Sequence, residues 1–585
     1  TWTAFGTVSG SSALLLSSAT QVRYVPDGSN GETASFAFVA WDQSSGTASA
    51  NGAPSTGNPG AGGGTTAYSS QAATASMTVS GVNDAPVLDS SGTMTLTTIT
   101  EDQTTNAGNT VASIVSSAGG DRITDVDTGA VEGIAITGVV SGNGTWQYST
   151  NGGGSWSNVG AVATNSALLL RSTDLLRFVP DALNADSASV SFRAWDRYTG
   201  SAGAKVDTTS NGGTTAFSSV TETAAITVSA VNDAPTITDA ATVALTGTHE
   251  DAASSATTVT SLLAAVAWAD VDSAALQGIA VTGTSGNGSW QYSTDGVSWT
   301  AFGTVSGSSA LLLSSTTQLR YVPDGENGET AGFSFVAWDQ SSGTASANGS
   351  PSTGNPGTGG GSSAFSSESA AATLTVSAVN DAPTITNGAT VALTGTTEDA
   401  TSSATTVATI LAGASWADVD TAALQGLAVT STTGNGTWEY STDGITWTAF
   451  GAVSASSALL LDATTQVRYV PDGSSVETAS FGFVAWDRSS GTASTNGLPS
   501  TANPGAGGGT TAFSSQAATA SMTVSAVNDA PVLDNSGTPT LTTITEDDTA
   551  GAGDTVAAIF ASAGGDRVTD VDAGALEGIA VTGLV

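Results

Sequence analysis

The sequence contains no cysteine and a single histidine, and each shortage excludes a class of function. Without cysteine there is no disulfide framework, no thiolate metal site and no cysteine nucleophile. One histidine, His249, cannot supply a zinc site built from several imidazoles. No run approaches about 18 consecutive apolar residues, so we expect no transmembrane helix and no direct membrane insertion.

Positive charge is also scarce, because 11 Lys and Arg residues stand against 50 Asp and Glu residues in a chain of 585. The formal net charge is −39, which phosphate backbones and anionic lipid surfaces would repel. We therefore expect no nucleic-acid partner. Hydrophobic residues still make up 39% of the chain, enough for packed cores, so the sequence is not a disordered acidic tail.

What the sequence does contain is a tandem repeat. The pentapeptide VNDAP begins at positions 82, 231, 379 and 527, in steps of 149, 148 and 148 residues. Two further landmarks keep nearly the same spacing. DVD begins at Asp125, Asp270, Asp418 and Asp570, and AWD ends at Asp42, Asp196, Asp339 and Asp487. Three landmarks that stay in phase along the chain indicate one structural unit repeated several times.

These landmarks predict three complete repeats, at 82–230, 231–378 and 379–526. Residues 1–81 match the C-terminal part of a repeat, and residues 527–585 match the N-terminal part. Because both ends fall inside a repeat, we expect the chain to be a segment of a longer repetitive polypeptide. In the alternative interpretation, neighbouring copies complete each other's partial repeats head to tail.

Each repeat has the residue pattern of an all-β domain. Short runs rich in Val, Thr and aromatic residues alternate with clusters of Gly, Asp, Asn and Ser, as in a β-sandwich. The pair Asp295-Gly296 predicts a two-residue type I′ hairpin turn. Residues Ala256–Val266 are expected to form a short helix or a strand. The strands expected in the repeat 231–378 are Thr242–Thr246, Gly278–Gly283, Trp290–Ser293, Val297–Phe302, Ala310–Leu313, Gln318–Val322, Gly332–Asp339 and Ala372–Val379.

A Gly/Ser-rich segment follows each AWD triplet, for example between Gln340 and Ser367. It has too little apolar surface to fold alone, so we predict a long loop. Such a loop explains why the repeat is longer than an immunoglobulin-like sandwich of about 100 residues.

Four acidic landmarks recur with few Lys or Arg residues to neutralise them. Clustered carboxylates need either separation in water or a hard cation, and oxygen ligands from Asp, Glu and Asn suit Ca²⁺. In an extended DVD segment both Asp side chains would lie on one side. The candidate ligands are the Asn-Asp of VNDAP (Asn83, Asp84, Asn232, Asp233, Asn380, Asp381, Asn528, Asp529), the Glu-Asp pairs (Glu101, Asp102, Glu250, Asp251, Glu398, Asp399, Glu546, Asp547), the DVD aspartates (Asp125, Asp127, Asp270, Asp272, Asp418, Asp420, Asp570, Asp572) and the AWD aspartates (Asp196, Asp339, Asp487).

Together, VNDAP after a strand, TED, DVD and the segment YVPD…GETAGFSFVAWD resemble the VNDAP-type, cadherin-like tandem repeats of large bacterial surface adhesins. The resemblance implies an all-β tandem array of immunoglobulin/cadherin-like β-sandwich domains of about 148 residues, with Ca²⁺ bound at their junctions. It implies that one junction is shared by Glu250, Asp251, Asn380, Asp381, Asp418 and Asp420.

The function implied by the resemblance is that of a non-enzymatic, extracellular cell-surface protein, the calcium-stiffened stalk or filament of an adhesin. Its expected partners are neighbouring copies, other surface components and glycans. Two alternatives remain open: a sheath, layer or fibre assembled laterally through the Gly/Ser loops, and a carbohydrate-binding array that uses Trp290 or Trp299. An enzyme is not expected, because catalysis needs one cleft with unequal carboxylates, whereas these recur in every repeat.

Overall fold

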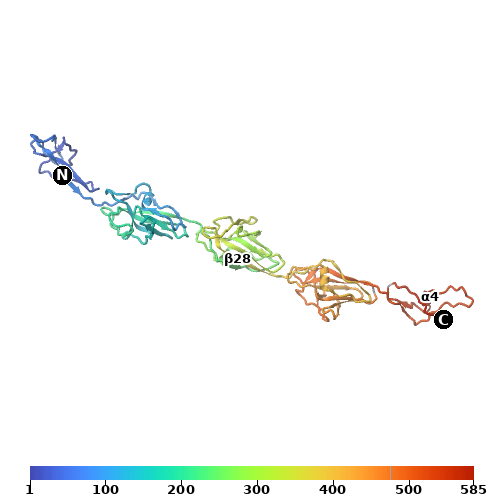
Figure 1. The fold of residues 1–585 in the computed structure, drawn as a ribbon. Coiled ribbons are helices and arrows are strands. Elements are labelled where there is room, and N and C mark those ends of the chain that lie inside the picture. Colours follow the sequence, from blue (N-terminus) through green and yellow to red (C-terminus); the bar gives the residue numbers. More distant parts are fainter. Residues whose placement is uncertain (475, 573) are drawn as a thin grey trace. The chain divides into compact units, whose positions relative to one another are not determined.

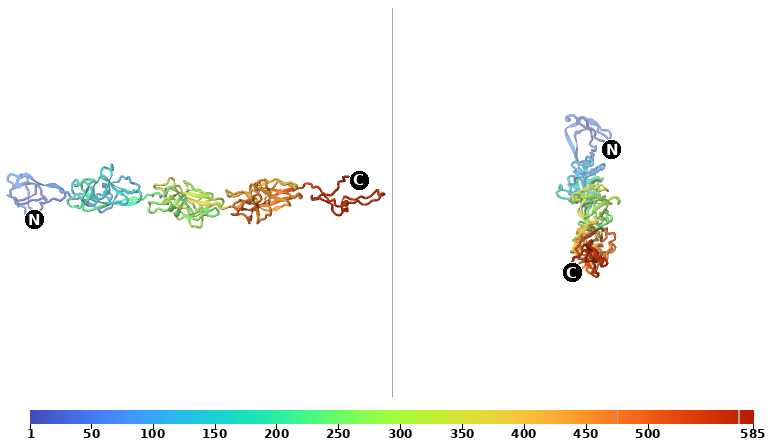
Figure 2. Two further views of the ribbon diagram at one scale, coloured as in Figure 1. Left: turned by 90° about the horizontal axis from the view of Figure 1, so that it is seen from below. Right: turned by 90° about the vertical axis from the view of Figure 1, so that its right-hand side faces the viewer.

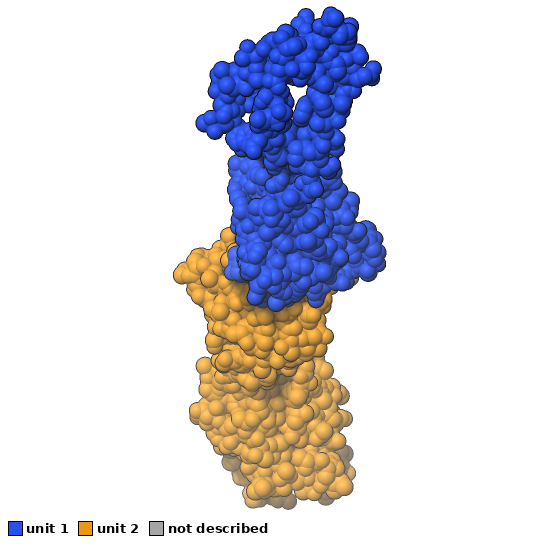
Figure 3. Space-filling view, turned by 90° about the vertical axis from the view of Figure 1, so that its left-hand side faces the viewer, with its two compact units in different colours: residues 1–234, 270–275, 360–363 blue, residues 235–269, 276–359, 364–585 orange. Residues whose placement is uncertain are grey.

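The computed structural model describes residues 1–474, 476–572 and 574–585. Its contacts divide the chain into two compact units, coloured separately in Figure 3. Unit 1 comprises residues 1–234, 270–275 and 360–363, and unit 2 comprises residues 235–269, 276–359 and 364–585. Each sandwich can be followed by its colour in Figure 1 and from two further directions in Figure 2.

Unit 1 contains one complete β-sandwich, within residues 82–230. Its larger sheet has the spatial order β16 (Lys205–Val206), β13 (Ala167–Arg171), β10 (Gly133–Val140), β15 (Asp186–Trp195), β17 (Glu222–Ser229) and β6 (Met94–Thr95), and β7 (Ile99–Thr100) also pairs with β17. The smaller sheet has the order β12 (Ser157–Asn158), β11 (Thr145–Ser149), β14 (Leu175–Val179) and β8 (Asn109–Thr110). A separate short pair joins β5 (Val87–Leu88) to β9 (Ile123–Thr124).

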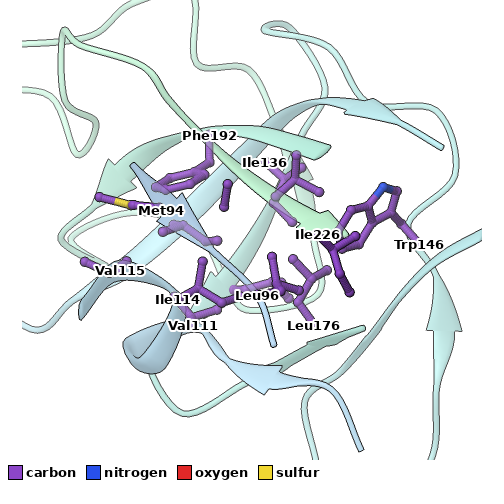
Figure 4. Packing of buried hydrophobic residues seen from close by; sticks show 14 of the residues in the cluster. Met94, Leu96, Val111, Ile114, Val115, Ile136, Trp146, Leu176, Phe192 and Ile226 are labelled. Carbon is purple, nitrogen blue, oxygen red and sulfur yellow. The ribbon is translucent and has the colours of Figure 1, made fainter. Parts of the chain in front are cut away.

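The two sheets are held together by an apolar core. Alternate residues of β15, such as Val190 and Phe192, are fully buried, as expected for a strand with one face on a core. From the smaller sheet, Trp146 and Phe178 pack against each other with ring centroids 5.3 Å apart. Ile114 of the single helix closes the same cluster (Figure 4).

That helix, α1 (Val111–Ser116), recurs at the same position in the other repeats as α2 (Val259–Ala265), α3 (Val407–Gly413) and α4 (Val556–Ser562). Each begins after a threonine whose side chain accepts a hydrogen bond from a backbone N–H three residues later. Such a cap satisfies one of the unpaired donors at a helix start. The caps are Thr110, Thr258, Thr406 and Thr555.

Unit 2 contains two further sandwiches with the same pair of sheets. In the first, the larger sheet has the order β18 (Ala241–Ala244), β28 (Phe365–Ser377), β26 (Glu329–Trp338), β21 (Gly278–Ser285), β24 (Ala310–Ser314) and β27 (Thr353–Gly354), with β19 (Thr248–His249) also on β28. The smaller has the order β20 (Thr257–Thr258), β25 (Gln318–Val322), β22 (Ser289–Ser293) and β23 (Thr300–Ala301).

In the second, the larger sheet has the order β29 (Thr390–Ala392), β39 (Phe513–Ser525), β37 (Glu477–Trp486), β32 (Gly426–Thr433), β35 (Ala458–Asp462) and β38 (Thr501–Ala502), with β30 (Thr396–Thr397) also on β39. The smaller has the order β31 (Thr405–Thr406), β36 (Gln466–Val470), β33 (Thr437–Ser441) and β34 (Thr448–Ala449). In each larger sheet, the strand that comes first in the chain pairs in parallel with the strand that comes last: β6 with β17, β18 with β28, and β29 with β39. Most other pairings are antiparallel.

Residues 1–81 form a smaller assembly. There β1 (Ala13–Leu14) pairs with β3 (Thr56–Gly57), and β2 (Glu32–Trp41) pairs with β4 (Tyr68–Val79). Phe38 on β2 is 47% exposed, whereas Phe335, at the matching position of β26, is fully buried. In residues 527–585, β40 (Val532–Leu533) pairs with β41 (Val568–Thr569) beside α4.

The predicted fold class, an all-β tandem array of immunoglobulin/cadherin-like sandwiches, is confirmed by these sheets. The segment Ala256–Val266 contains both α2 and β20, and all eight predicted strands overlap observed ones. The predicted end of the Gly/Ser loop at Ser367 is wrong, because β28 already begins at Phe365, which packs beside Trp338. Among the described residues, no helix is long and apolar enough to cross a membrane.

The predicted type I′ turn at Asp295-Gly296 is also wrong. Strand β22 ends at Ser293 and β23 begins only at Thr300, and of the two central residues only Gly296 has a positive φ, of 73°. The Asp295 carboxylate instead accepts the backbone N–H groups of Val297 and Ser298, at 2.8 and 2.7 Å. A side chain therefore closes this turn, in place of the backbone geometry that the dipeptide predicts.

Candidate metal centres

The VNDAP segments are linkers whose backbone N–H groups are bound on both sides. In the linker that begins at Val379, the Val379 N–H donates to Oε1 of Glu250 in the preceding sandwich. The Asp381 N–H donates to Oδ2 of Asp420 in the following sandwich, at 2.9 Å. The Ala382 N–H donates to the carbonyl of Gly509, at 2.8 Å. Three separate chain segments thus fix the course of this linker.

Two of these bonds recur at the linkers that begin at Val231 and Val527. The linker Asp N–H bonds the second Asp of DVD at 2.9 Å for Asp233 and at 2.8 Å for Asp529. The Val231 and Val527 N–H groups donate to the glutamates of the preceding Glu-Asp pairs, Glu101 and Glu398. The repeat in the sequence is therefore a repeat of junction geometry.

These bonds bring three carboxylates together at each of three linkers. One oxygen from each carboxylate lies within 4.8 Å of the other two. The glutamates are almost completely buried, with exposures of 1% for Glu101, 2% for Glu250 and 3% for Glu398. The clusters are Glu101–Asp233–Asp272 in unit 1, and Glu250–Asp381–Asp420 and Glu398–Asp529–Asp572 in unit 2.

The DVD segment contributes its two aspartates in different ways. The Asp418 carboxylate accepts the N–H of Asp420 at 2.9 Å, which turns the chain and sends the Asp420 carboxylate into the cluster. The expected extended DVD segment, with both side chains on one side, is therefore not what the structure has. Burial raises the pKa of Asp418, and the carboxylates of Asp420, Asp487 and Asp381 raise it further, so Asp418 still lies in the field of the cluster.

Burial and crowding disfavour the ionised form of the linker aspartates Asp233, Asp381 and Asp529. Burial is the largest cause that raises the pKa of Asp381, followed by the charges of Asp420, Asp251 and Glu250. The pKa of Asp233 is raised in the same way, by burial and then by Asp272, Glu101, Asp102 and Asp270. Asp102, Asp251, Asp270 and Asp418 therefore border these clusters.

The residues fit a hard cation. One carboxylate oxygen each of Glu101, Glu250, Asp233, Asp381 and Asp529 is buried without a hydrogen-bond partner. Ion pairs among the described residues include those of Asp89, Asp174, Glu439 and Asp534, none of which belongs to a cluster. Buried anionic oxygens without donors or cations are costly, and an all-oxygen set of this kind is what Ca²⁺ takes.

The AWD aspartates were predicted as ligands, but they are not members of the three clusters. Asp487 accepts the N–H of Ser489 at 2.7 Å and the side-chain amide of Asn380 at 2.9 Å. Asp196 makes the same pair of bonds, to the Tyr198 N–H and to Asn83. Asp339 likewise accepts the N–H of Ser341. Asp196 and Asp487 thus hold a turn and anchor the linker asparagine, and Asp339 holds the corresponding turn.

The side-chain amides of the linker asparagines donate hydrogen bonds to nearby backbone carbonyls. Asn380 and Asn232 each donate to the carbonyl of the next residue, at 3.0 and 3.1 Å, and Asn528 does so at 2.9 Å. Asn380 also reaches the Thr511 carbonyl at 3.3 Å. In these bonds the amide nitrogen is the donor, and the bonds fix the linker.

The remaining predicted residues lie at the ends of the array. The Asp84 N–H donates to Asp127 at 2.7 Å, and Asp125 accepts the Asp127 N–H, so the first linker has the DVD half of the arrangement. Glu546 and Asp547 are exposed and lie outside the three clusters.

One group of functional residues is missing from the sequence predictions. The glycine-rich segments supply the carbonyls of Gly213, Gly361 and Gly509, which accept the N–H of the alanine in VNDAP. The signal was present, because a glycine run recurs in phase with every linker. The Gly/Ser segment is thus part of the junction.

Comparisons with known proteins leave the chain without an identified family. No family model matches the sequence, and no curated protein does. Extracellular cadherin domains 1–5 of protocadherin gamma B2 align over 89% of this chain and 72% of that chain, with 12% identity and a TM-score of 0.39. Domains EC21–23 of human CDH23 align over 50% of this chain and 76% of that chain, with 13% identity and a TM-score of 0.24. An endo-fucoidan hydrolase of glycoside hydrolase family 107 aligns over 76% of this chain and 45% of that chain, with 12% identity and a TM-score of 0.18. None of these likenesses identifies a function.

Proposed function

We propose that the chain is a non-enzymatic, extracellular structural or adhesion protein, a calcium-stiffened stretch of the stalk or filament of a bacterial cell-surface adhesin. In this proposal its domains are 82–230, 231–378 and 379–526, flanked by the partial repeats 1–81 and 527–585. The observation that carries the proposal is the recurrence, at three linkers, of a buried glutamate and a linker aspartate in one carboxylate cluster.

The proposed Ca²⁺ ligands at one junction are Glu250, Asp381 and Asp420, with Asp251 and Asp418 bordering the site. A cation held there would neutralise three carboxylates that belong to a preceding sandwich, a linker and a following sandwich. Because only the bound state ties the three segments through one ion, Ca²⁺ would restrict bending at the linker. The affinity expected of such extracellular modules is a Kd of about 10⁻⁴–10⁻³ M.

The test compares the whole chain in chelator and in millimolar Ca²⁺. Small-angle X-ray scattering should show less flexibility with Ca²⁺, and calorimetry should detect binding; equal concentrations of Mg²⁺ are the control, because Mg²⁺ sheds its water reluctantly. Identical scattering profiles without measurable heat would contradict the proposal.

The tryptophans do not favour the carbohydrate-binding alternative. Trp290 is only 4% exposed and packs against Tyr321 and Phe333. Trp299 is half-buried, and the guanidinium of Arg320 lies 4.2 Å from the centre of its ring. One aromatic face that could stack on a sugar is therefore already covered by a cation.

The Gly/Ser loop, on which lateral assembly would depend, is used in part by its own sandwich. Strand β27 pairs with β24, and the Ser346 N–H donates to the Leu312 carbonyl at 2.9 Å. Sedimentation velocity over a range of concentrations separates the two proposals, because lateral assembly predicts growing species and a stalk segment does not.

A further inference from the structure

One asparagine side chain connects two consecutive sandwiches of unit 2. Asn327 lies in the loop between β25 and β26, and its Nδ2 donates to the carbonyl of Val419 at 3.0 Å. Its Oδ1 accepts the N–H of Thr421 at 3.1 Å. These two peptide groups stand immediately before and after Asp420, whose carboxylate belongs to the cluster with Glu250 and Asp381.

The same contact occurs independently in unit 1. Asn30 donates to the carbonyl of Val126 at 2.9 Å and accepts the N–H of Thr128 at 2.7 Å, with the Thr128 hydroxyl as a second donor at 2.8 Å. Here the bonded peptide groups flank Asp127, the equivalent of Asp420. The same pair of hydrogen bonds therefore occurs in two separate repeats, so we treat it as a feature of the repeat.

The glycine after each asparagine sets how close the loop approaches the linker. A Cβ at Gly328 would lie 2.6 Å from the backbone nitrogen of Ala378, and one at Gly31 would lie 2.5 Å from that of Gly81. Any other residue would clash with backbone, so the loop would have to move away. The Asn-Gly pair therefore seats the loop against its own linker and places the amide within reach of the next DVD segment.

We propose that Asn327 and Asn30 are positioning residues that hold the DVD segment in its ion-binding conformation before any cation binds. The Asp418 carboxylate already fixes the N–H of Asp420, and Asn327 fixes the peptide groups on either side of it. With its backbone bonded in this way, Asp420 presents its carboxylate without further ordering when an ion arrives. Preorganisation by residues outside the ligand set typically raises metal affinity.

This inference rests on the proposed calcium function, and it adds that the junctions differ in their affinity for Ca²⁺. The loop that precedes the Glu101 cluster has Asn184-Ala185, and the Asn184 amide bonds Asp181 of its own loop at 3.2 Å. The loop that precedes the Glu398 cluster has Ser475-Val476 in the sequence, with Ser475 outside the described residues. Of the three carboxylate clusters, the Glu250–Asp381–Asp420 cluster is the one preceded by an Asn-Gly pair, and it should fill at the lowest Ca²⁺ concentration.

The experiment is hydrogen–deuterium exchange with mass spectrometry on the whole chain during a Ca²⁺ titration. The readout is the exchange of the peptide that contains the Thr421 amide, compared between the wild type and Asn327→Ala. In chelator, the variant should exchange this amide several-fold faster, because its acceptor is gone. The Ca²⁺ concentration at half-protection should rise about tenfold, the usual cost of losing a residue that orients a ligand.

Further measurements test whether the effect of Asn327→Ala is confined to its own junction. The peptide around Thr128, held by Asn30, should be unchanged in the Asn327→Ala chain and should respond in the reciprocal Asn30→Ala chain. Asn184→Ala, which removes a bond within one loop, should leave the Thr421 peptide unchanged. An equal melting temperature in chelator for the wild type and Asn327→Ala shows that the sandwiches themselves are intact.

The outcomes separate the two proposals. If Ca²⁺ protects the wild type but the midpoint at Thr421 is the same in Asn327→Ala, the positioning role is overturned and the calcium function stands. If Ca²⁺ protects none of the three junctions in the wild type, the calcium function fails and the coupling fails with it. A lower midpoint at the Glu398 cluster than at the Glu250 cluster would overturn the ranking and the positioning role.

Discussion

The backbone N–H of Asp381 donates to the Oδ2 of Asp420 at 2.9 Å, so an aspartate of the linker is held by an aspartate of the next sandwich. The equivalent bond is present at Asp84, Asp233 and Asp529. A carboxylate accepts this bond best when it is ionised, yet its neighbours in the cluster are carboxylates too. At the three clusters the hydrogen bond favours an ionised carboxylate while the neighbouring charges oppose it, a conflict that a bound cation would remove.

This conflict predicts opposite effects of one substitution with and without calcium. In Glu250→Gln, the Oε1 can still accept the Val379 N–H, while the second, unpartnered oxygen becomes an amide. We expect the Kd for Ca²⁺ at this junction to rise about tenfold, because the site loses a charged ligand. The chelator-treated protein should be no less stable than the wild type. Calorimetric titration and thermal unfolding in both conditions measure the two effects.

The matched control is Asp207→Asn, which removes the same charge from an exposed turn. It should leave Ca²⁺ affinity unchanged, whereas Glu398→Gln should repeat the Glu250→Gln result at its own junction. Equal loss of affinity in the control would mean that total charge, and not the cluster, determines binding.

The sequence alone predicts the sandwich and the set of acidic residues, because both repeat in phase. The alternating apolar pattern of β26 and the in-phase carboxylates are visible without any structure. It could not show which acidic residues lie together, since an aspartate that accepts turn N–H groups and one that belongs to a carboxylate cluster are the same residue type. The AWD aspartate Asp487 is bound by Asn380 and Ser489, and this assignment needed the tertiary contacts.

The two hydrogen bonds between Asn327 and the following DVD segment could not be predicted from the sequence either. An Asn-Gly pair in a turn normally indicates local backbone geometry, and nothing in the sequence links residue 327 to residues 419 and 421. The comparison of repeats gives a partial signal, because the pair is present in two of the four equivalent loops and replaced by Asn184-Ala185 and Ser475-Val476 in the others.

The turns that contain Asp295 and Asp443 predict that stability depends on pH. The repeat in unit 1, which has Asn151 at this position, serves as the control. The N–H groups of Val297 and Ser298 hold the pKa of Asp295 far below its usual range, and those of Thr446 and Ile445 do the same for Asp443. A depressed pKa gives stability that is present above the unfolded value of about 3.9 and is lost as pH falls through the folded value.

The measurement is calorimetric unfolding of the wild type and of the double variant Asp295→Asn, Asp443→Asn between pH 7 and pH 2. The wild type should be more stable at pH 7, and the difference should shrink as the pH falls. The sandwich of unit 1 already has Asn151 at this position, where it accepts the Ser155 N–H at 2.9 Å, so the substitution is compatible with the turn. A difference that does not change with pH would contradict this role of the carboxylate.

A core substitution should destabilise one sandwich and leave the others intact. Leu262 on α2 is fully buried between the sheets of its own repeat, within a cluster that belongs to residues 237–376. Leu262→Ala should lower the free energy of unfolding of that sandwich by about 2–5 kcal/mol. Ile410→Ala, at the matching position of α3, should do the same in the next sandwich. Hydrogen exchange across the core strands would show whether the loss stays local, as expected for repeats with separate cores.

The last prediction uses a difference between repeats as its template. The Tyr321 hydroxyl bonds Glu329 and accepts the Gly288 N–H, and burial together with Glu329 raises the pKa of Tyr321. Tyr321→Phe should cost about 1–3 kcal/mol, because the N–H and the carboxylate both lose their partner. The repeat in unit 1 has Phe178 and Asp186 at these two positions, so the double variant Tyr321→Phe, Glu329→Asp should be more stable than the sum of the single losses predicts. Thermal unfolding of the four proteins in this cycle gives the coupling energy, and strictly additive losses would show that the two positions act independently.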